Sequence, residues 1–175
     1  MTERVTHVTQ GHFRVSDRPG ELLCTVLGSC IAACLHDPVR RIGGMNHFLL
    51  PGADPSDLGN VKYGSHAMEQ LINALLRAGA DRGRLQARIY GGGNVVAGLG
   101  RIGGANAAFA REFMAYEGIA LVADDTGGAV GRRVRFDPAA GTARVFRIDP
   151  AQVTERPDMT RPVAGPRAGR GVELF

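Results

Sequence analysis

Three apolar segments of strand length follow one another between residues 22 and 50, and they constrain the fold more than any other feature. They are LLCTVLG, CIAACLH and RRIGGMNHFLL. Gly28-Ser29 separates the first two, and the turn signal Asp37-Pro38 separates the second from the third. Short apolar runs bounded in this way predict β-strands, so we expect strands here, with a hairpin between the second and third.

Two helical segments interrupt a chain that otherwise predicts strands. In residues 60–79, apolar side chains recur at helical spacing, and Gly79 stands where a C-terminal cap is expected. In residues 105–118, Asn106 is the expected N-cap and Gly118 ends the helix. Further strands are predicted at LQARIYG, IALVAD, GRRVRFD and TARVFRID. This order predicts an α/β domain of the α+β type, a layered α-β sandwich with mixed or antiparallel sheets and two main helices.

Composition places the end of the folded domain near residue 149. The chain has 175 residues, of which 44% are hydrophobic and 22% charged, as expected for one globular domain. From Pro150 onward, Pro, Arg and Gly predominate with little periodicity. We therefore expect a domain over residues 1–149 and a flexible tail over 150–175. Because no signal peptide or membrane-spanning run is evident, we expect a cytoplasmic protein with reduced thiols.

Several functional classes fit the sequence poorly. The net charge of +4 does not predict nucleic-acid binding, because the arginines are scattered and aromatic residues make up only 6%. The three cysteines form no CxxC pair and the histidines lack zinc-ligand spacing, so no disulfide framework or metal site is expected. The segment GGGNVV lacks the Lys-Ser/Thr of a P-loop, so we expect a loop where backbones approach closely. The segment DDTGG is expected to end a strand.

A hairpin turning at residues 37–40 would bring Cys30 and His47 together. With that turn, paired residue numbers sum to 77, so Cys30 lies opposite His47. Opposed side chains have Cβ atoms roughly 4.5–5.5 Å apart. A one-residue bulge would shift the pair to a diagonal, which a histidine side chain still spans. Since an imidazole stabilises a nearby thiolate, Cys30 could attack an acyl carbon while His47 transfers protons. Gly28 and Ser29 permit a tight turn that could aim N–H groups at the resulting oxyanion.

The remaining candidates carry simpler interpretations. Thr25 is the nearest polar residue that could orient the imidazole. A cysteine in an apolar strand is most often a small core residue, which is our expectation for Cys24 and Cys34. We expect His36 and His66 to be structural as well.

These residues also carry a resemblance to a known family. LGSC, the Asp-Pro turn and GGMNHFLLP look like the CheD family, the chemoreceptor glutamine deamidases, as do YGGGNVV and the block from Ile102 to Gly128. The similarity extends from Val5 to Ile148. It implies a cysteine-dependent amidohydrolase that converts receptor glutamines to glutamate and releases ammonia, with no cofactor. It also implies Cys30 as nucleophile, His47 as base, and a fold resembling the catalytic domains of deamidating toxins.

The resemblance further implies a threonine ahead of Gly-Ser-Cys as the third catalytic residue. Some members read Thr-Leu-Gly-Leu-Gly-Ser-Cys, one residue longer than here, so an ungapped match would place Cys24 at that position; we favour Thr25. Implied partners are the cytoplasmic helices of chemoreceptors (methyl-accepting chemotaxis proteins) and a CheC-type phosphatase, with the membrane reached only through the receptors. Alternatives are a non-enzymatic adaptor and a thiol protease or receptor methylesterase, because amide and ester cleavage share the acyl-enzyme step.

Overall fold

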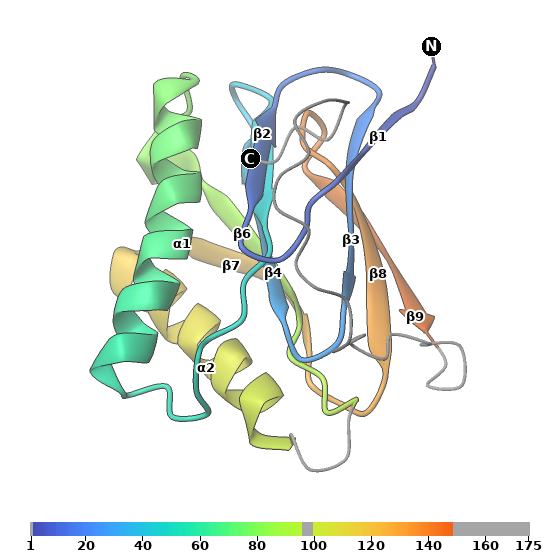
Figure 1. Ribbon diagram of the computed structural model, residues 1–175. Helices are drawn as coiled ribbons and strands as arrows, with labels where there is room; N and C mark the ends of the chain where they lie inside the picture. The colour runs from blue at the N-terminus through green and yellow to red at the C-terminus, as the bar shows by residue number, and fades with distance from the viewer. Residues whose placement is uncertain (1, 96–99, 149–175) are drawn as a thin grey trace, which may run out of the picture.

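Residues 2–95 and 100–148, which the computed structural model describes, form three layers (Figure 1). The strands are β1 (Arg4–His7), β2 (Phe13–Ser16), β3 (Glu21–Leu27), β4 (Ile31–Asp37), β5 (Ile42–Asn46), β6 (Gln86–Gly91), β7 (Ala120–Thr126), β8 (Gly131–Asp137) and β9 (Thr142–Ile148). The helices are α1 (Leu58–Arg77) and α2 (Gly100–Glu117), with a short 3-10 turn at Arg82–Arg84. Both helices cover one face of a five-stranded sheet, β2-β5-β4-β6-β7, and a four-stranded sheet, β1-β3-β8-β9, covers the other. The predicted layered α-β sandwich with two main helices is confirmed.

Strand β4 lies at the centre of the sandwich, and its seven residues are all buried. Ile31, Ala33 and Leu35 point into the core shared with the helices. Ala32 and Cys34 point into the core between the two sheets. Because successive side chains of a strand point to opposite faces, an uninterrupted apolar run is what a strand covered on both faces requires.

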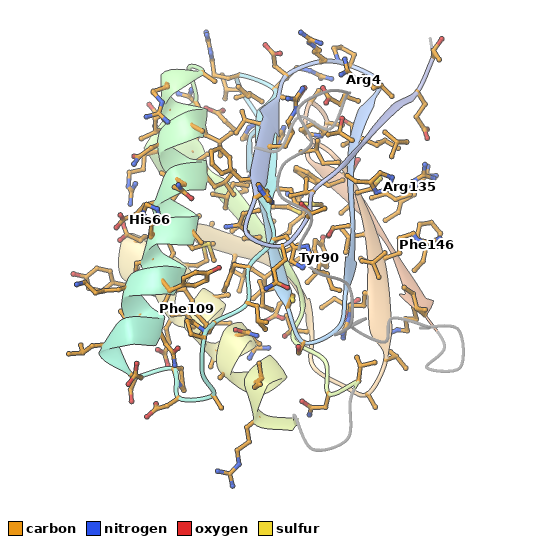
Figure 2. All side chains as sticks on the ribbon, viewed as in Figure 1. Arg4, His66, Tyr90, Phe109, Arg135 and Phe146 are labelled. Carbon is orange, nitrogen blue, oxygen red and sulfur yellow. The ribbon has the colours of Figure 1, made fainter. Side chains whose placement is uncertain are left out.

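Labelled side chains in Figure 2 mark these layers. Tyr90 lies between the two sheets, and Phe109 extends from α2 toward α1. Arg135 and Phe146 lie on the outer face of the four-stranded sheet, where Phe146 is exposed. The two apolar cores are therefore separate, one on each face of the five-stranded sheet.

The two helices differ in how well their ends were predicted. Helix α1 begins after Asp57, whose carboxylate accepts from the N–H groups of Gly59 and Asn60, and Gly79 follows it at φ 105°. For α2, the predicted N-cap at Asn106 is wrong, because the helix already includes Gly100. Its first turns approach the glycine-rich loop after β6 so closely that a Cβ on Gly103 would meet the loop's carbonyl oxygens.

The β4–β5 hairpin forms as predicted, but its register is wrong by two residues. Asp37 pairs with Ile42 and Cys34 with Met45, so the turn lies at residues 38–41 and paired numbers sum to 79 rather than 77. Asp37 ends the strand because its buried carboxylate accepts from the N–H groups of Val39 and Arg40. Arg41 closes the turn in the left-handed region, at φ 53°.

Strands β1 and β2 do not appear among the predicted elements. β1 pairs in parallel with β3 in one sheet, whereas β2 pairs antiparallel with β5 in the other. The segment 8–12 therefore crosses from one sheet to the other. The predicted tail over 150–175 lies outside the described residues. Within residues 2–95 and 100–148, neither helix combines the length and the apolar character that a membrane crossing needs.

Candidate active site

His47 is held between the two sheets by Thr25 and Val8. The Thr25 hydroxyl donates to the Val8 carbonyl oxygen at 2.7 Å and lies 2.8 Å from His47 Nδ1. His47 Nδ1 also lies 3.2 Å from the same carbonyl oxygen. Because a carbonyl only accepts and the hydroxyl proton is already used, all three contacts are satisfied when Nδ1 carries the proton. The remaining ring nitrogen, Nε2, then bears a lone pair.

The surroundings of Nε2 differ from those of Nδ1. His47 is 8% exposed, and its Nε2 is buried with no hydrogen-bond partner among residues 2–95 and 100–148. Burial lowers the pKa of His47, and the hydrogen bond to Val8 opposes this only in part. The imidazole is therefore neutral at pH 7, with an unoccupied acceptor. This is the state that a general base requires.

Cys30 lies just before β4, on the same face of the sheet as His47. Ile31 forms an isolated bridge with Phe48, which places His47 opposite Ala32 and one diagonal step from Cys30. The predicted direct opposition of Cys30 and His47 is wrong, because the register of the hairpin is shifted. Their common face follows from strand alternation: Ala32 and Cys30 both pack against the core between the sheets.

Cys30 differs from the other two cysteines in exposure. Cys24 and Cys34 are buried, as predicted, whereas Cys30 is half-buried. Burial raises the pKa of the Cys34 thiol and of the Cys24 thiol, with Arg135 opposing the shift at Cys24. Cys24 faces the opposite side of β3 from Thr25, because neighbouring strand residues alternate. Thr25 is accordingly the residue that contacts His47.

The backbone around Cys30 is fixed by the glycine-rich loop after β6. The Cys30 carbonyl oxygen accepts from the N–H of Gly92 at 2.8 Å, and the Gly28 carbonyl oxygen accepts from Gly93 at 2.9 Å. Gly91 has φ 107°, and a Cβ there would collide with the Cys30 carbonyl oxygen. The prediction that this loop serves close backbone approach is confirmed.

Asn106 secures the bend at Gly28-Ser29 from the helix side. Its Nδ2 donates to the Ser29 carbonyl oxygen at 2.8 Å, and its Oδ1 accepts from the N–H of Leu50 at 2.8 Å. Asn106 is fully buried in the interior of α2. The predicted N-cap position of Asn106 is thus wrong; the available signal was an amide residue within an apolar helical segment.

Arg132 supports the same loop from β8. Its guanidinium is almost completely buried and donates to the carbonyl oxygens of Gly127, at 2.7 Å, and Gly91, at 3.3 Å. It also forms an ion pair with Asp125. Gly128 accepts from the N–H of Asn94, one residue beyond the loop's glycines. The glycines of DDTGG thus end β7 and hold the loop beneath Cys30, in agreement with their structural interpretation.

Two further residues at the site were not predicted. Val8 acts through its backbone carbonyl, for which a sequence carries no signal. Gln10 extends its side chain to Cys30, with 3.7 Å between Cys30 Sγ and Gln10 Oε1. Across residues 2–95 and 100–148, His, Cys, Asp and Glu side chains form no group of three that could hold a metal ion.

Comparisons with known proteins show which family the chain resembles. The family model described as CheD chemotactic sensory transduction matches residues 49–147. The chain is 52% identical to the "Probable chemoreceptor glutamine deamidase CheD" of Jannaschia sp. (strain CCS1) over 98% of this chain and 94% of the relative. It is 52% identical to the protein of that name from Caulobacter sp. (strain K31), covering 97% and 92%. For the one from Rhizobium rhizogenes, the identity is 45%, covering 99% and 97%.

A solved structure shows the same layered architecture. The crystal structure of Neisseria meningitidis protein NMB0706 matches with a TM-score of 0.51 and 12% identity, over 72% of this chain and 64% of that one. At this identity the likeness concerns the fold alone. The family match over residues 49–147 and the identity of 45–52% over nearly the full length of these relatives show that the chain belongs to the CheD family.

Proposed function

We propose that this protein is a cysteine-dependent deamidase, which converts particular glutamines on the cytoplasmic helices of chemoreceptors to glutamate. Its relatives carry the name chemoreceptor glutamine deamidase. The observation that carries the proposal is His47 itself, bound through Nδ1 by Thr25 and Val8, while no described residue forms a hydrogen bond with Nε2. An imidazole fixed in this tautomer is suited to take a proton from a thiol on the same face.

In the first half of the reaction, Cys30 is the nucleophile. Its thiol proton passes to His47 Nε2, and the thiolate attacks the Cδ carbon of the substrate carboxamide. The imidazolium then protonates the departing nitrogen, so the C–N bond breaks and ammonia leaves. The products of this half are a thioester between Cys30 and the substrate side chain, and a neutral His47.

In the second half, water replaces the sulfur. His47 Nε2 removes a proton from the water molecule, which attacks the thioester carbon and releases Cys30. In both halves, we assign stabilisation of the oxyanion to backbone N–H groups at the Gly28-Ser29 bend. The hydrogen bonds from Asn106 and Gly93 to that bend support this role, because they fix the bend in advance of the reaction.

The proposed product adds one negative charge to a receptor helix for each turnover. A new carboxylate changes the repulsion between neighbouring helices and provides a glutamate available for methylation. The proposed partners are thus receptor cytoplasmic helices, which the protein would meet in the cytoplasm. Family resemblance supports a CheC-type phosphatase as a second partner, testable by co-purification.

Mass spectrometry of a receptor cytoplasmic fragment tests the proposal. With the wild-type protein, we expect a gain of about one mass unit at defined glutamines, the change from an amide to a carboxylic acid. Cys30→Ser should abolish the gain, because a hydroxyl is a far weaker nucleophile here. Cys24→Ser is the matched control and should retain most activity, since Cys24 lies on the other face of β3.

Two outcomes would contradict the proposal. Equal loss of activity in folded Cys30→Ser and Cys24→Ser proteins would refute Cys30 as the unique nucleophile. Binding of the fragment with no mass change, tried on several receptors, would favour the adaptor function instead.

A further inference from the structure

The side chain of Gln10 stands at the nucleophile. The Cys30 thiol donates to Gln10 Oε1, with 3.7 Å between the sulfur and the oxygen, which is within hydrogen-bond distance for sulfur. Gln10 belongs to the segment that crosses between the sheets and is itself exposed. The functional group at its end is a carboxamide. This is the same group that the proposed reaction attacks.

The backbone of Gln10 is anchored on both sides. Before it, the N–H of Val8 donates to the Cys24 carbonyl oxygen at 2.8 Å. After it, the N–H of Gly11 donates to the His47 carbonyl oxygen at 2.7 Å, and His12 accepts from the N–H of His47. The main chain at Gln10 therefore keeps its place beside the site, while the exposed side chain has space to rotate away.

The contact with Gln10 favours the protonated form of the Cys30 thiol. A thiol that donates to an amide oxygen is in its protonated form, and the acceptor on His47, Nε2, has no partner within the part of the chain that the structure describes. Proton transfer from Cys30 to His47 requires the thiol to leave Gln10 Oε1 and turn toward Nε2. A substrate carboxamide that displaces Gln10 would release the thiol for that step.

We propose that the Gln10 carboxamide is an internal occupant of the substrate position, which holds the Cys30 thiol in its protonated form until a substrate glutamine displaces it. This inference rests on the proposed deamidase function for the identity of the competing group. It makes Gln10 a determinant of substrate affinity. The contact is reversible, because it is a single hydrogen bond that an exposed side chain accepts.

Alkylation of Cys30 by iodoacetamide at pH 7 tests the contact without any receptor. The modified peptide is identified by mass spectrometry, which separates Cys30 from the two buried cysteines. Gln10→Ala should speed alkylation by about two- to tenfold, the factor that one lost neutral hydrogen bond commonly produces. Gln10→Glu should slow it, because a carboxylate beside the sulfur disfavours the thiolate. Thr9→Ala, a neighbouring exposed change whose hydroxyl contacts His12, should leave the rate unchanged.

Slower alkylation in Gln10→Ala would overturn the inference, because the amide would then be stabilising the thiolate. Unchanged rates in both Gln10 variants would overturn it as well. A Cys30-dependent conversion of Gln10 to glutamate in the wild-type protein would also overturn it, since a consumed group cannot be a standing occupant.

Kinetics with a receptor fragment test the competition. Gln10→Ala should lower KM, because the substrate carboxamide no longer displaces a bound one, and an unchanged KM would overturn this part. If the wild-type protein leaves every receptor unmodified, the proposed function fails, while the alkylation rates still decide whether Gln10 holds the thiol.

Discussion

Replacing Thr25 with valine removes the hydroxyl that orients His47 and keeps the β-branched shape that suits a strand. The hydroxyl makes two buried contacts, a donated hydrogen bond to Val8 O at 2.7 Å and the contact with His47 Nδ1 at 2.8 Å. In Thr25→Val, the Val8 oxygen still accepts from Nδ1 at 3.2 Å, so no buried polar atom loses its last partner. The imidazole keeps its tautomer but is held less firmly.

These contacts set the size of the expected effect. A neutral buried hydrogen bond contributes about 0.5–1.5 kcal/mol net, so losing two, with one acceptor still satisfied, should lower the free energy of unfolding by about 1–2 kcal/mol. A comparable loss of orientation at the base corresponds to a roughly tenfold fall in kcat, since about 1.4 kcal/mol is a factor of ten in rate. Complete loss of activity is not expected.

Urea denaturation measures the first quantity, and a mass-spectrometric time course on a receptor fragment measures the second. Thr25→Ser is the matched control: it retains the hydroxyl and should keep kcat within about threefold. Undiminished kcat in Thr25→Val would refute the role of Thr25. So would equal impairment in Thr25→Ser, because the hydroxyl that this variant retains would then not be what supports activity.

Two further predictions concern His47 and the loop beneath Cys30. Because burial lowers the pKa of His47, kcat/KM should fall only as the pH drops below about 6.5. The free energy of unfolding should decline over the same pH interval, since the unfolded chain binds the proton more readily than the folded one. A pH–rate profile with its acid midpoint above about pH 6.5 would contradict this prediction. Gly91→Ala should displace Cys30 and abolish either its alkylation or the fold, because the new Cβ would collide with the Cys30 carbonyl oxygen. Gly104→Ala is the control: its Cβ has open space, so it should stabilise α2 by up to about 1 kcal/mol. Thermal unfolding compares the two variants, and equal melting temperatures would count against the proposed collision.

The layered fold was predictable because its elements carry strong local signals. The apolar runs flanking Gly28-Ser29 and the helical periodicity of residues 60–79 each follow from short-range pattern. The register of the β4–β5 hairpin does not follow from short-range pattern. Asp37 is paired to Arg84, 47 positions further along the chain, and its strand ends one residue later than an Asp-Pro turn suggests. A sequence pattern does not reveal such a partner.

The candidate site likewise contains residues that the sequence predicts and residues that it does not. Cys30, His47 and Thr25 are chemically distinctive residues near strand ends, and both spacing and family resemblance select them. Val8, Gln10 and Asn106 contribute through contacts made only after the sheets and α2 have packed together. Val8 contributes its backbone carbonyl oxygen, an atom that every residue possesses, so its side-chain type gives no sign of this role.

The position of Val8 has a consequence for how the site responds to its surroundings. The carbonyl that fixes the His47 imidazole follows β1, a four-residue edge strand with three exposed residues. Edge strands near chain ends are the first parts of a domain to open in local unfolding. Fraying of β1 would loosen His47 while both cores stay packed. A preparation with an intact fold and a disturbed N-terminus could then resemble a catalytically dead variant, so amide exchange at Val8 would report on the fraction of competent molecules better than a melting temperature.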